Sequence, residues 1–215
     1  MNRIRRGARV AWLVAFLTLL VTCALPTGPA SAEQGDGCYY TGTGCNWKFS
    51  RSGAYSYANY YHNRRNSSYS AYSDNCTNFS SQVWHEGGGV PLDQYSPYWE
   101  PNYNTLSWQT AREFRTYWDA QEDYAYYRID RDITNPYNPA GIGDVIVYDL
   151  GKGKNIAWTH TAVEHHYDGR GDYVAQNTTD AIRTWNYWYY HHSSSEQYWQ
   201  RQHGYRIIGP KNTRA

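Results

Sequence analysis

The chain lacks an excess of charge of either sign. Its 215 residues include 20 Lys and Arg against 19 Asp and Glu, which gives a formal net charge of +1. Proteins that bind nucleic acid by neutralising phosphates need a clear excess of basic side chains, so we expect no nucleic-acid partner. Charged residues are scarce in general, at 18% of the chain.

Long hydrophobic runs are also missing beyond the N-terminus, and the mean hydropathy of −0.85 excludes a protein with several membrane spans. Leu is sparse and Met occurs once, whereas Tyr occurs 24 times and Trp 10 times. This aromatic content excludes a disordered chain, because disordered segments contain few aromatic residues. The length predicts one folded domain with, at most, a small appendage.

The first 32 residues have the three parts of a secretory signal peptide. Residues 1–9 carry four Arg and no acid, residues 10–25 are almost continuously apolar, and Ala30-Ser31-Ala32 matches a small-residue cleavage site. A retained membrane anchor is the alternative, but the apolar run is short for a membrane span. We therefore expect residues 1–32 to be removed and the protein to be secreted, with no attachment to the membrane afterwards.

Few cysteines remain after this leader. Cys38 and Cys45 bracket a short glycine-containing loop, which predicts a disulfide in an oxidising compartment. This disulfide would hold residues 33–52 as an N-terminal arm. The pairing leaves Cys76 over, and an odd thiol in a secreted protein is either functional or an inert buried side chain.

The remaining chain reads as one domain over residues 53–210, followed by a tail over residues 211–215. Helical periodicity predicts three helices, over residues 54–61, 74–84 and 106–118. Strand patterns predict four strands, over residues 145–148, 159–167, 172–177 and 205–208. Because the helices come first and the strands second, the sequence predicts an α+β fold with N-terminal helices packed on a C-terminal antiparallel sheet.

Three residues suggest nucleophilic chemistry. Cys76 falls in the first turn of its predicted helix, where the helix dipole favours a thiolate and free N–H groups can bind an oxyanion. His160, at the start of a predicted strand, is the best-placed base. Asn177 ends the next predicted strand and is our candidate for orienting that imidazole, with Gln176 as the less favoured choice.

Other residues near these positions are candidates for contacting a substrate. Asn78 and Gln82 lie one turn apart on the Cys76 helix, where their amides reach either a substrate or a neighbouring loop that they anchor. Trp158 precedes His160 on its strand and is a third candidate. No Cys and His spacing typical of zinc is present, and we expect no metal and no organic cofactor.

Several motifs together resemble the bacterial putative amidase domain family, which is grouped with papain-like cell-wall peptidases and amidases of the CHAP and NlpC types. The resemblance spans roughly residues 53–210 and rests on the segments Asn75 to Gln82, Gly87 to Gly89, Gly143 to Asp149 and Trp158 to Val163. It implies a papain-like cysteine hydrolase fold in which Cys76 is the nucleophile and His160 the general base. The chain departs from the family pattern twice, with Asn75 in place of Asp and Asn177 in place of a frequent His.

The resemblance implies a hydrolase that cleaves an amide in peptidoglycan or a related peptide through an acyl-thioester. Together with the leader this predicts a secreted enzyme, which we expect to be a monomer. Muramoyl-alanine amidase, endopeptidase and small-amide hydrolase activities all remain open, as does acyl transfer to an amine. A catalytically silent module that binds cell-wall glycan is the alternative from another class. Its affinity would come from the aromatic runs of residues 124–127 and 185–190, which otherwise belong to the core.

Overall fold

The structure, a computed structural model, describes residues 48–94, 98–102, 105–121, 125–128, 133–150, 158–191, 205–210 and 213–214. The predicted signal peptide of residues 1–32 and the predicted disulfide between Cys38 and Cys45 lie outside the described residues. Cys76, the one cysteine within them, is free and buried. No helix in these ranges is long and apolar enough to cross a membrane.

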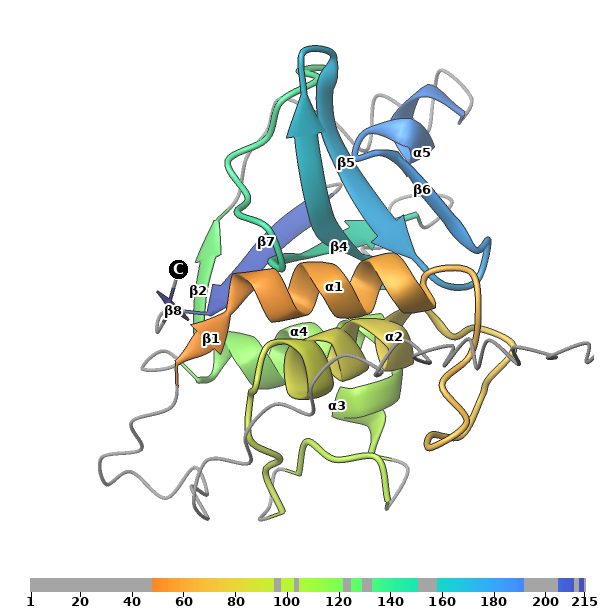
Figure 1. Cartoon of the computed structure of the whole chain (residues 1–215), viewed down its shortest axis with the longest axis vertical. Coiled ribbons are helices and arrows are strands. Elements are labelled where there is room, and N and C mark those ends of the chain that lie inside the picture. The colour runs from red at the N-terminus through yellow and green to blue at the C-terminus, as the bar shows by residue number, and fades with distance from the viewer. Residues whose placement is uncertain are drawn as a thin grey trace, which may run out of the picture.

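Helices and an antiparallel sheet form the two layers of the molecule (Figure 1). Its elements are β1 (Phe49–Ser50), α1 (Arg51–Tyr61), α2 (Cys76–Gln82), the π-helical turn η1 (Val83–Gly87), α3 (Leu106–Gln109), α4 (Ala111–Asp119), β2 (Ala125–Arg128), β3 (Val145–Asp149), β4 (Trp158–Asp168), β5 (Gly171–Gln176), β6 (Ala181–Thr184), α5 (Tyr187–Tyr190), β7 (Tyr205–Pro210) and β8 (Thr213–Arg214). The main sheet has the strand order β2-β7-β3-β4-β5-β6, with every neighbouring pair antiparallel. The predicted α+β class and antiparallel sheet are confirmed.

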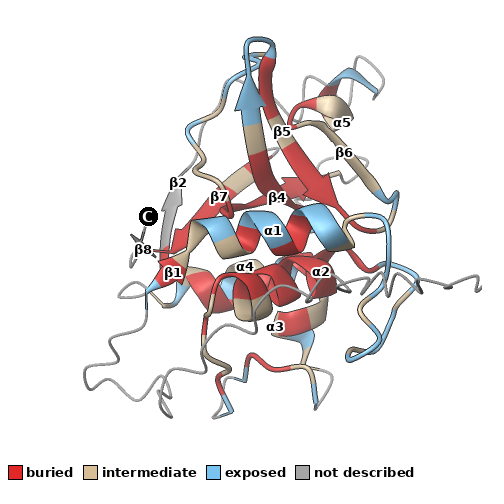
Figure 2. Ribbon diagram, in the orientation of Figure 1, coloured by how far each residue is buried: buried red, intermediate tan, exposed pale blue. Residues whose placement is uncertain are grey.

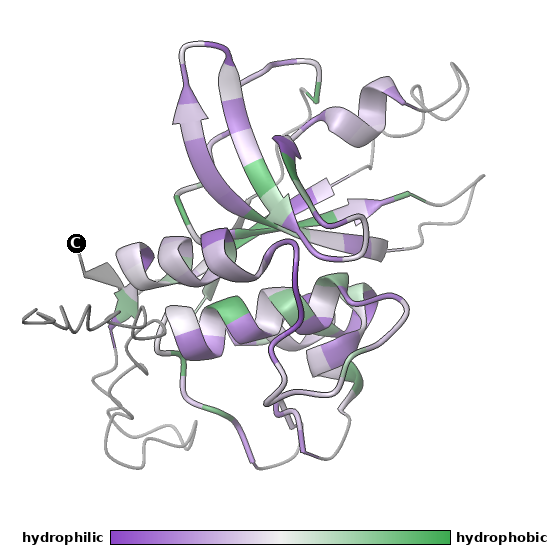
Figure 3. Ribbon diagram, turned by 45° about the vertical axis from the view of Figure 1, so that its right-hand side comes forward, coloured by the Kyte–Doolittle hydropathy of each residue, from purple (hydrophilic) through white to green (hydrophobic). Residues whose placement is uncertain are grey.

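The centre of the sheet is buried on both faces. Alternate residues of a strand point to opposite faces, and Val145 and Val147 of β3 accordingly join the apolar cluster that the helices cover. Ile146 and Tyr148 join a second cluster on the other face, together with Trp185. Figure 3 shows the hydrophobic residues where the sheet meets the helices, while the outer end of the β4–β5 hairpin is hydrophilic.

Helix α1 is amphipathic, as its periodicity predicts, and starts at Arg51. Ala54, Tyr57 and Ala58 are buried, while the outer side of the helix is exposed (Figure 2). Ser50 caps the N-terminus, because its side chain accepts a hydrogen bond from the N–H of Gly53 at 3.1 Å. Helix α2 differs in kind, since all seven of its residues are buried.

The single helix predicted over residues 106–118 is wrong. Thr110 takes an extended conformation, with φ −116° and ψ 138°, and divides the segment into α3 and α4. The residues chosen as the buried face, including Trp108, Phe114 and Trp118, are all buried nonetheless. Trp108 of α3 and the side chains Phe114 and Trp118 of α4 therefore join the same apolar cluster from two separate helices.

The two short strands β1 and β8, near the two ends of the described chain, were not predicted from the sequence. β1 pairs in parallel with β8, and Phe49 of β1 is fully buried. A Cβ at Gly88 would lie 2.1 Å from the Phe49 ring, so only glycine allows this packing. The described fold thus includes residues assigned above to the arm and to the tail. β2, β6 and α5 were also not predicted, because each is only four residues long.

Aromatic rings form much of the core. Trp84 is fully buried, its ring centroid lies 4.7 Å from that of Trp118, and its indole N–H donates to the carbonyl of Gly143 at 2.8 Å. Trp99 lies 4.8 Å from Trp108 and 5.0 Å from Trp118. These contacts account for part of the tryptophan content through packing.

Replacing Trp84 with Ala should lower the free energy of unfolding by about 3–5 kcal/mol, because the change leaves a large cavity in a rigid aromatic cluster. Urea unfolding followed by circular dichroism measures this loss. Leu106→Ala is the control, since Leu106 is 61% exposed and its truncation should cost no more than about 0.5 kcal/mol. Equal losses in the two variants would contradict the assigned core.

Candidate active site

Cys76 is the first residue of α2 and is 5% exposed. The residue before it, Asn75, accepts hydrogen bonds through Oδ1 from the N–H of Tyr72 at 3.2 Å and from Asn78 Nδ2 at 2.8 Å. The Asn75 N–H donates to Thr178 Oγ1 at 3.0 Å. These bonds fix the start of α2 against the chain that follows β5, and with it the position of the sulfur.

The sulfur lies where β4 and β5 stop pairing. The hydrogen-bonded pairs between these strands end at Val163 and Ala175, so residues 158–162 at the start of β4 are not paired with β5. The backbone N–H and C=O of Glu164 bond to Asp144 and Gly143, which lie just before β3. Because successive N–H groups of a strand point to opposite sides, those of Val163 and Thr161 point toward β5 instead. The N–H of Thr161 therefore points into the gap between the strands, and it donates to the Cys76 thiol.

The surroundings of Cys76 favour its ionised form. Burial raises the pKa of the thiol, but the charge of His160 and a hydrogen bond from its ring lower it. The Thr161 N–H and the Thr77 hydroxyl also stabilise the thiolate, and the pKa falls from 9.0 to about 7. With a pKa of about 7, the Cys76 thiol ionises more readily at neutral pH than an ordinary cysteine.

Gln176 orients the His160 ring. His160 Nε2 lies 2.8 Å from Gln176 Oε1, which also receives the indole N–H of Trp188 at 3.3 Å. Gln176 Nε2 donates to Thr179 Oγ1. Because an indole N–H only donates, the atom that faces both rings is an oxygen, and His160 Nε2 carries the proton. The Nδ1 nitrogen of His160 is thus left to accept the proton of the thiol.

The expected place of Asn177 beside His160 is wrong, and the less favoured Gln176 takes that place. The reason is a β-bulge in β4. Near the turn Asp168 pairs with Gly171, but the register shifts by one residue between Glu164 and His166. Without this shift Asn177 would face the same side as His160, and with it Gln176 does. No feature of the sequence indicated the bulge.

Asn177 instead ties three segments together and is fully buried. Its Nδ2 donates to the carbonyls of Tyr61, His62 and Arg64 at 2.8–3.2 Å. Its Oδ1 accepts from Asn75 Nδ2 at 2.6 Å. Asn177 thereby joins the end of α1 to the start of α2, and it acts as a structural clamp.

The candidate substrate contacts Asn78 and Gln82 are occupied within the protein. Asn78 is 2% exposed, accepts from Trp108 Nε1 at 2.7 Å and donates to the carbonyl of Ser70 at 2.9 Å. Gln82 is 4% exposed and accepts from the Tyr57 hydroxyl at 2.9 Å. Both side chains therefore anchor α2 to its neighbours, which is the alternative that the sequence left open.

Trp158 is buried at the start of β4, with the guanidinium carbons of Arg115 and Arg206 5.1 Å and 5.7 Å from the ring centroid. Its described contacts are with these two side chains and with the helix-covered cluster. Within the described ranges, no group of three or more His, Cys, Asp or Glu side chains is placed to hold a metal ion. The site brings together the thiol of Cys76, the imidazole of His160 and the amide of Gln176.

Alkylation of Cys76 should follow the fraction of thiolate, with half-maximal rate at a pH of about 7. In His160→Ala the burial that raises the pKa remains, whereas the charge and hydrogen bond that lower it are lost. The midpoint should therefore rise well above 7. Rates of iodoacetamide labelling, followed by mass spectrometry of the Cys76 peptide, measure this shift. His191→Ala, which removes an exposed ring, should leave the midpoint near 7, and an unshifted profile in His160→Ala would exclude the pair.

The variants Gln176→Ala and Asn177→Ala should separate the orientation of His160 by Gln176 from the structural role of Asn177. Asn177→Ala removes a donor from three carbonyls, of which that of Tyr61 keeps the Arg64 N–H, and leaves the Asn75 amide without its acceptor. It should lower the free energy of unfolding by about 2–4 kcal/mol, since each unpaired buried group costs about 1–3 kcal/mol. Below its melting temperature the variant should keep the pH profile of Cys76 labelling. Gln176→Ala should alter that profile with a smaller loss of stability. The reverse pattern would restore Asn177 as the partner of His160.

Comparison with known proteins identifies the family of the chain. Residues 48–202 match the model of the family described as putative amidase domain. The uncharacterized protein YhbB of Bacillus subtilis is 33% identical over 149 residues, which are 66% of this chain and 45% of that protein. The chain thus spans less than half the length of this relative. No solved structure shows significant similarity to the chain. Because the family model covers well over half of the chain, the protein belongs to the putative amidase domain family, whose description denotes amide hydrolysis.

Proposed function

We propose that this protein is a secreted cysteine amidase or peptidase that hydrolyses an amide bond in peptidoglycan or a related cell-wall peptide. The observation that carries the proposal is the chain of contacts from Trp188 through Gln176 and His160 to Cys76. It ends at a thiol with a pKa of about 7 at the start of a helix. A buried structural cysteine needs none of these contacts.

The proposed reaction begins with transfer of the thiol proton from Cys76 to Nδ1 of His160. The thiolate attacks the carbonyl carbon of the amide, and the free N–H groups in the first turn of α2 stabilise the oxyanion. The C–N bond then breaks, His160 returns its proton to the leaving nitrogen, and a thioester remains on Cys76. Water, deprotonated by His160, attacks this thioester and releases a carboxylic acid and the free thiol. The balance is one amide and one water consumed, and one acid and one amine formed.

Gln176 has a positioning role in this scheme. Its amide oxygen accepts the Nε2–H of His160 and so keeps the ring in the tautomer that the first step needs. Trp188 contributes a second donor to the same oxygen, and its ring lies edge-on to His160 with 5.3 Å between centroids. The pair keeps the amide oxygen turned toward the imidazole.

A papain-like arrangement, secretion and the cell-wall substrate are parts of the same proposal. A cysteine at a helix N-terminus that faces a histidine on an antiparallel sheet supports the first. The tripartite leader of residues 1–32 supports export, which brings the protein to the compartment where peptidoglycan lies. The family description supports hydrolysis of an amide.

Digestion of purified peptidoglycan, followed by mass spectrometry of the products, tests the function. The protein should release fragments with new amine and carboxyl ends, and Cys76→Ser should release none while keeping its unfolding midpoint. His160→Ala should lose on the order of 10²–10⁴-fold in rate, the contribution of a positioned acid–base group. Asn177→Ala, assayed where it is folded, is the control and should retain its turnover.

Three outcomes separate the alternatives. New ends that mark one bond identify the substrate linkage. Products that carry an added amine nucleophile would replace hydrolysis with acyl transfer. Binding to cell walls that survives in Cys76→Ser, with no product from the unaltered protein, would overturn the proposal in favour of a binding module.

A further inference from the structure

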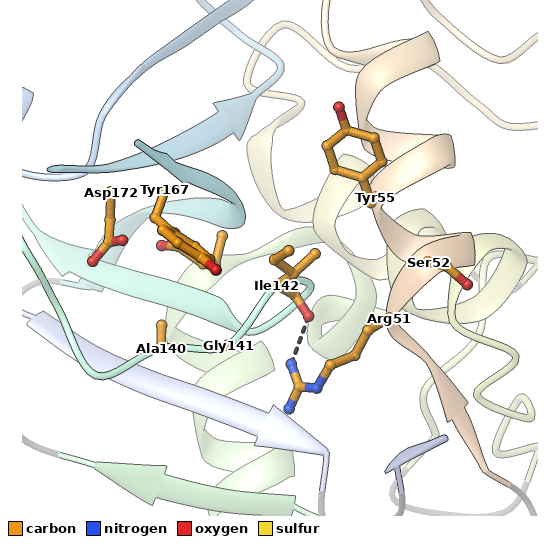
Figure 4. A pocket seen from close by; sticks show the side chains of 9 residues that line it. Arg51, Ser52, Tyr55, Ala140, Gly141, Ile142, Tyr167 and Asp172 are labelled. Carbon is orange, nitrogen blue, oxygen red and sulfur yellow. Dashed lines mark hydrogen bonds between the residues drawn. The ribbon is translucent and has the colours of Figure 1, made fainter. Parts of the chain in front are cut away.

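A pocket of about 540 Å³ lies between the first turn of α1, the loop before β3 and the outer part of the β4–β5 hairpin. Figure 4 shows Tyr167 and Asp172 on one side of it, with Tyr55 and Ser52 of α1 on the other. The side chains that matter here are Arg51, Tyr55, Ile142, Glu164, Tyr167 and Asp172. Neither Cys76 nor His160 lines this pocket, so it is a feature separate from the proposed active site.

Two carboxyl groups line the pocket although they are almost fully buried. Glu164 is 2% exposed, and its Oε2 accepts from Asn138 Nδ2 at 3.1 Å. Its Oε1 has no hydrogen-bond partner among the residues that the structure describes. Asp172 is 7% exposed and accepts from the N–H of Asn138 at 2.5 Å. Two buried carboxyl groups whose described hydrogen bonds come only from Asn138 thus form part of the wall of the pocket.

The pocket also lacks the positive charge that two buried carboxyl groups call for. Arg51 lines it, but its guanidinium group is taken by Asp144 Oδ1 at 2.9 Å and by the carbonyl of Ile142 at 2.5 Å. Among the described residues, no Lys or Arg forms an ion pair with Glu164 or with Asp172. Burial raises the pKa of both carboxyl groups, which is the expected result when a countercharge is missing.

We propose that this pocket binds an organic cation, an alkylammonium or alkylguanidinium group carried by a small amine or by the side chain of a basic peptide. The charged head contacts Glu164 and Asp172. The alkyl stem lies against Ile142 and the rings of Tyr55 and Tyr167, which are partly exposed at the pocket and attract cations through their faces. This binding is independent of the reaction proposed for Cys76.

Other ligand classes fit the pocket less well. A divalent metal ion needs several ligands, and no group of three or more His, Cys, Asp or Glu in the described part of the chain is placed to hold one. An anion would have to displace Asp144 from Arg51 and would then lie beside two further carboxyl groups. The alkyl stem of an organic cation, in contrast, contacts the apolar part of the lining, which a metal ion or a small anion would not contact.

The proposed binding depends on pH in a defined direction. The titratable groups around Glu164 are Arg51 of α1, Asp144 before β3, Tyr148 of β3 and Asp172 of β5. In the empty pocket burial keeps Glu164 protonated above the pH at which an exposed Glu ionises. A bound cation favours the ionised form, so binding releases a proton and tightens as the pH rises.

Isothermal titration of the Cys76→Ser variant tests the proposal without any contribution from turnover. The probes are pentylamine and N-acetyl-lysine methylamide, with pentanol and N-acetyl-norleucine methylamide as uncharged counterparts. At least one amine should bind at least about tenfold more tightly than its counterpart, the usual worth of a charged hydrogen bond. Binding of pentylamine alone identifies a small amine, and binding of the lysine derivative alone identifies a peptide. Titration in two buffers of different ionisation enthalpy should show release of a proton.

Matched variants assign this binding to the pocket. Glu164→Gln removes the charge but keeps an acceptor for Asn138, and should weaken amine binding by at least about tenfold. Asp168→Asn removes an exposed carboxylate from the same hairpin and should change affinity less than twofold. Should Glu164→Gln fail to fold, Asp172→Asn takes its place. Three results would overturn the proposal. The amines could bind no more tightly than their uncharged counterparts, they could bind equally well to both pocket variants, or they could fail to bind at all.

Discussion

One extra residue in β4 determines how the side chains of the candidate active site and of the pocket beside Glu164 are arranged. The register between β4 and β5 shifts between Glu164 and His166, so that β4 carries His165 in excess of its partner. Before the shift this places Gln176 on the face of the sheet that carries His160. Beyond it, Tyr167 pairs with Asp172 and shares the face of Glu164. The same bulge therefore gives His160 its amide partner and gathers the two buried carboxyl groups beside one pocket.

The sequence predicted what depends on local periodicity. The helix at Cys76, the strand at His160 and the β4–β5 hairpin all appear where their patterns placed them. The third member of the site was misassigned, because the choice between Gln176 and Asn177 depends on strand register, and a bulge of one residue reverses which of them faces the histidine. A similar limit applied at Thr110, where the requirement of the core for two helix directions overrode a continuous helical pattern.

Asn75 and Asn177 are joined by one hydrogen bond of 2.6 Å. The amide nitrogen of Asn177 is committed to three backbone carbonyls, so the atom that it presents to residue 75 is an acceptor. Residue 75 must then donate, which an amide does and a carboxylate cannot. An Asp before the cysteine would set two oxygens against each other here. Asn75 and Asn177 together keep the start of the cysteine helix fixed without a charge beside the thiol.

Three tryptophan side chains donate hydrogen bonds that hold parts of the fold and of the candidate site. A core built from indole rings rather than from Leu or Met contains N–H donors that need acceptors. Trp84 finds one in the carbonyl of Gly143, Trp108 in Asn78 and Trp188 in Gln176. The amides of Asn78 and Gln176 are thus held by the packing of the core as well as by their local contacts. Trp108, in the helix-covered cluster, thus holds an anchor of the cysteine helix, while Trp188, beside the cluster on the other face of the sheet, holds the partner of the histidine.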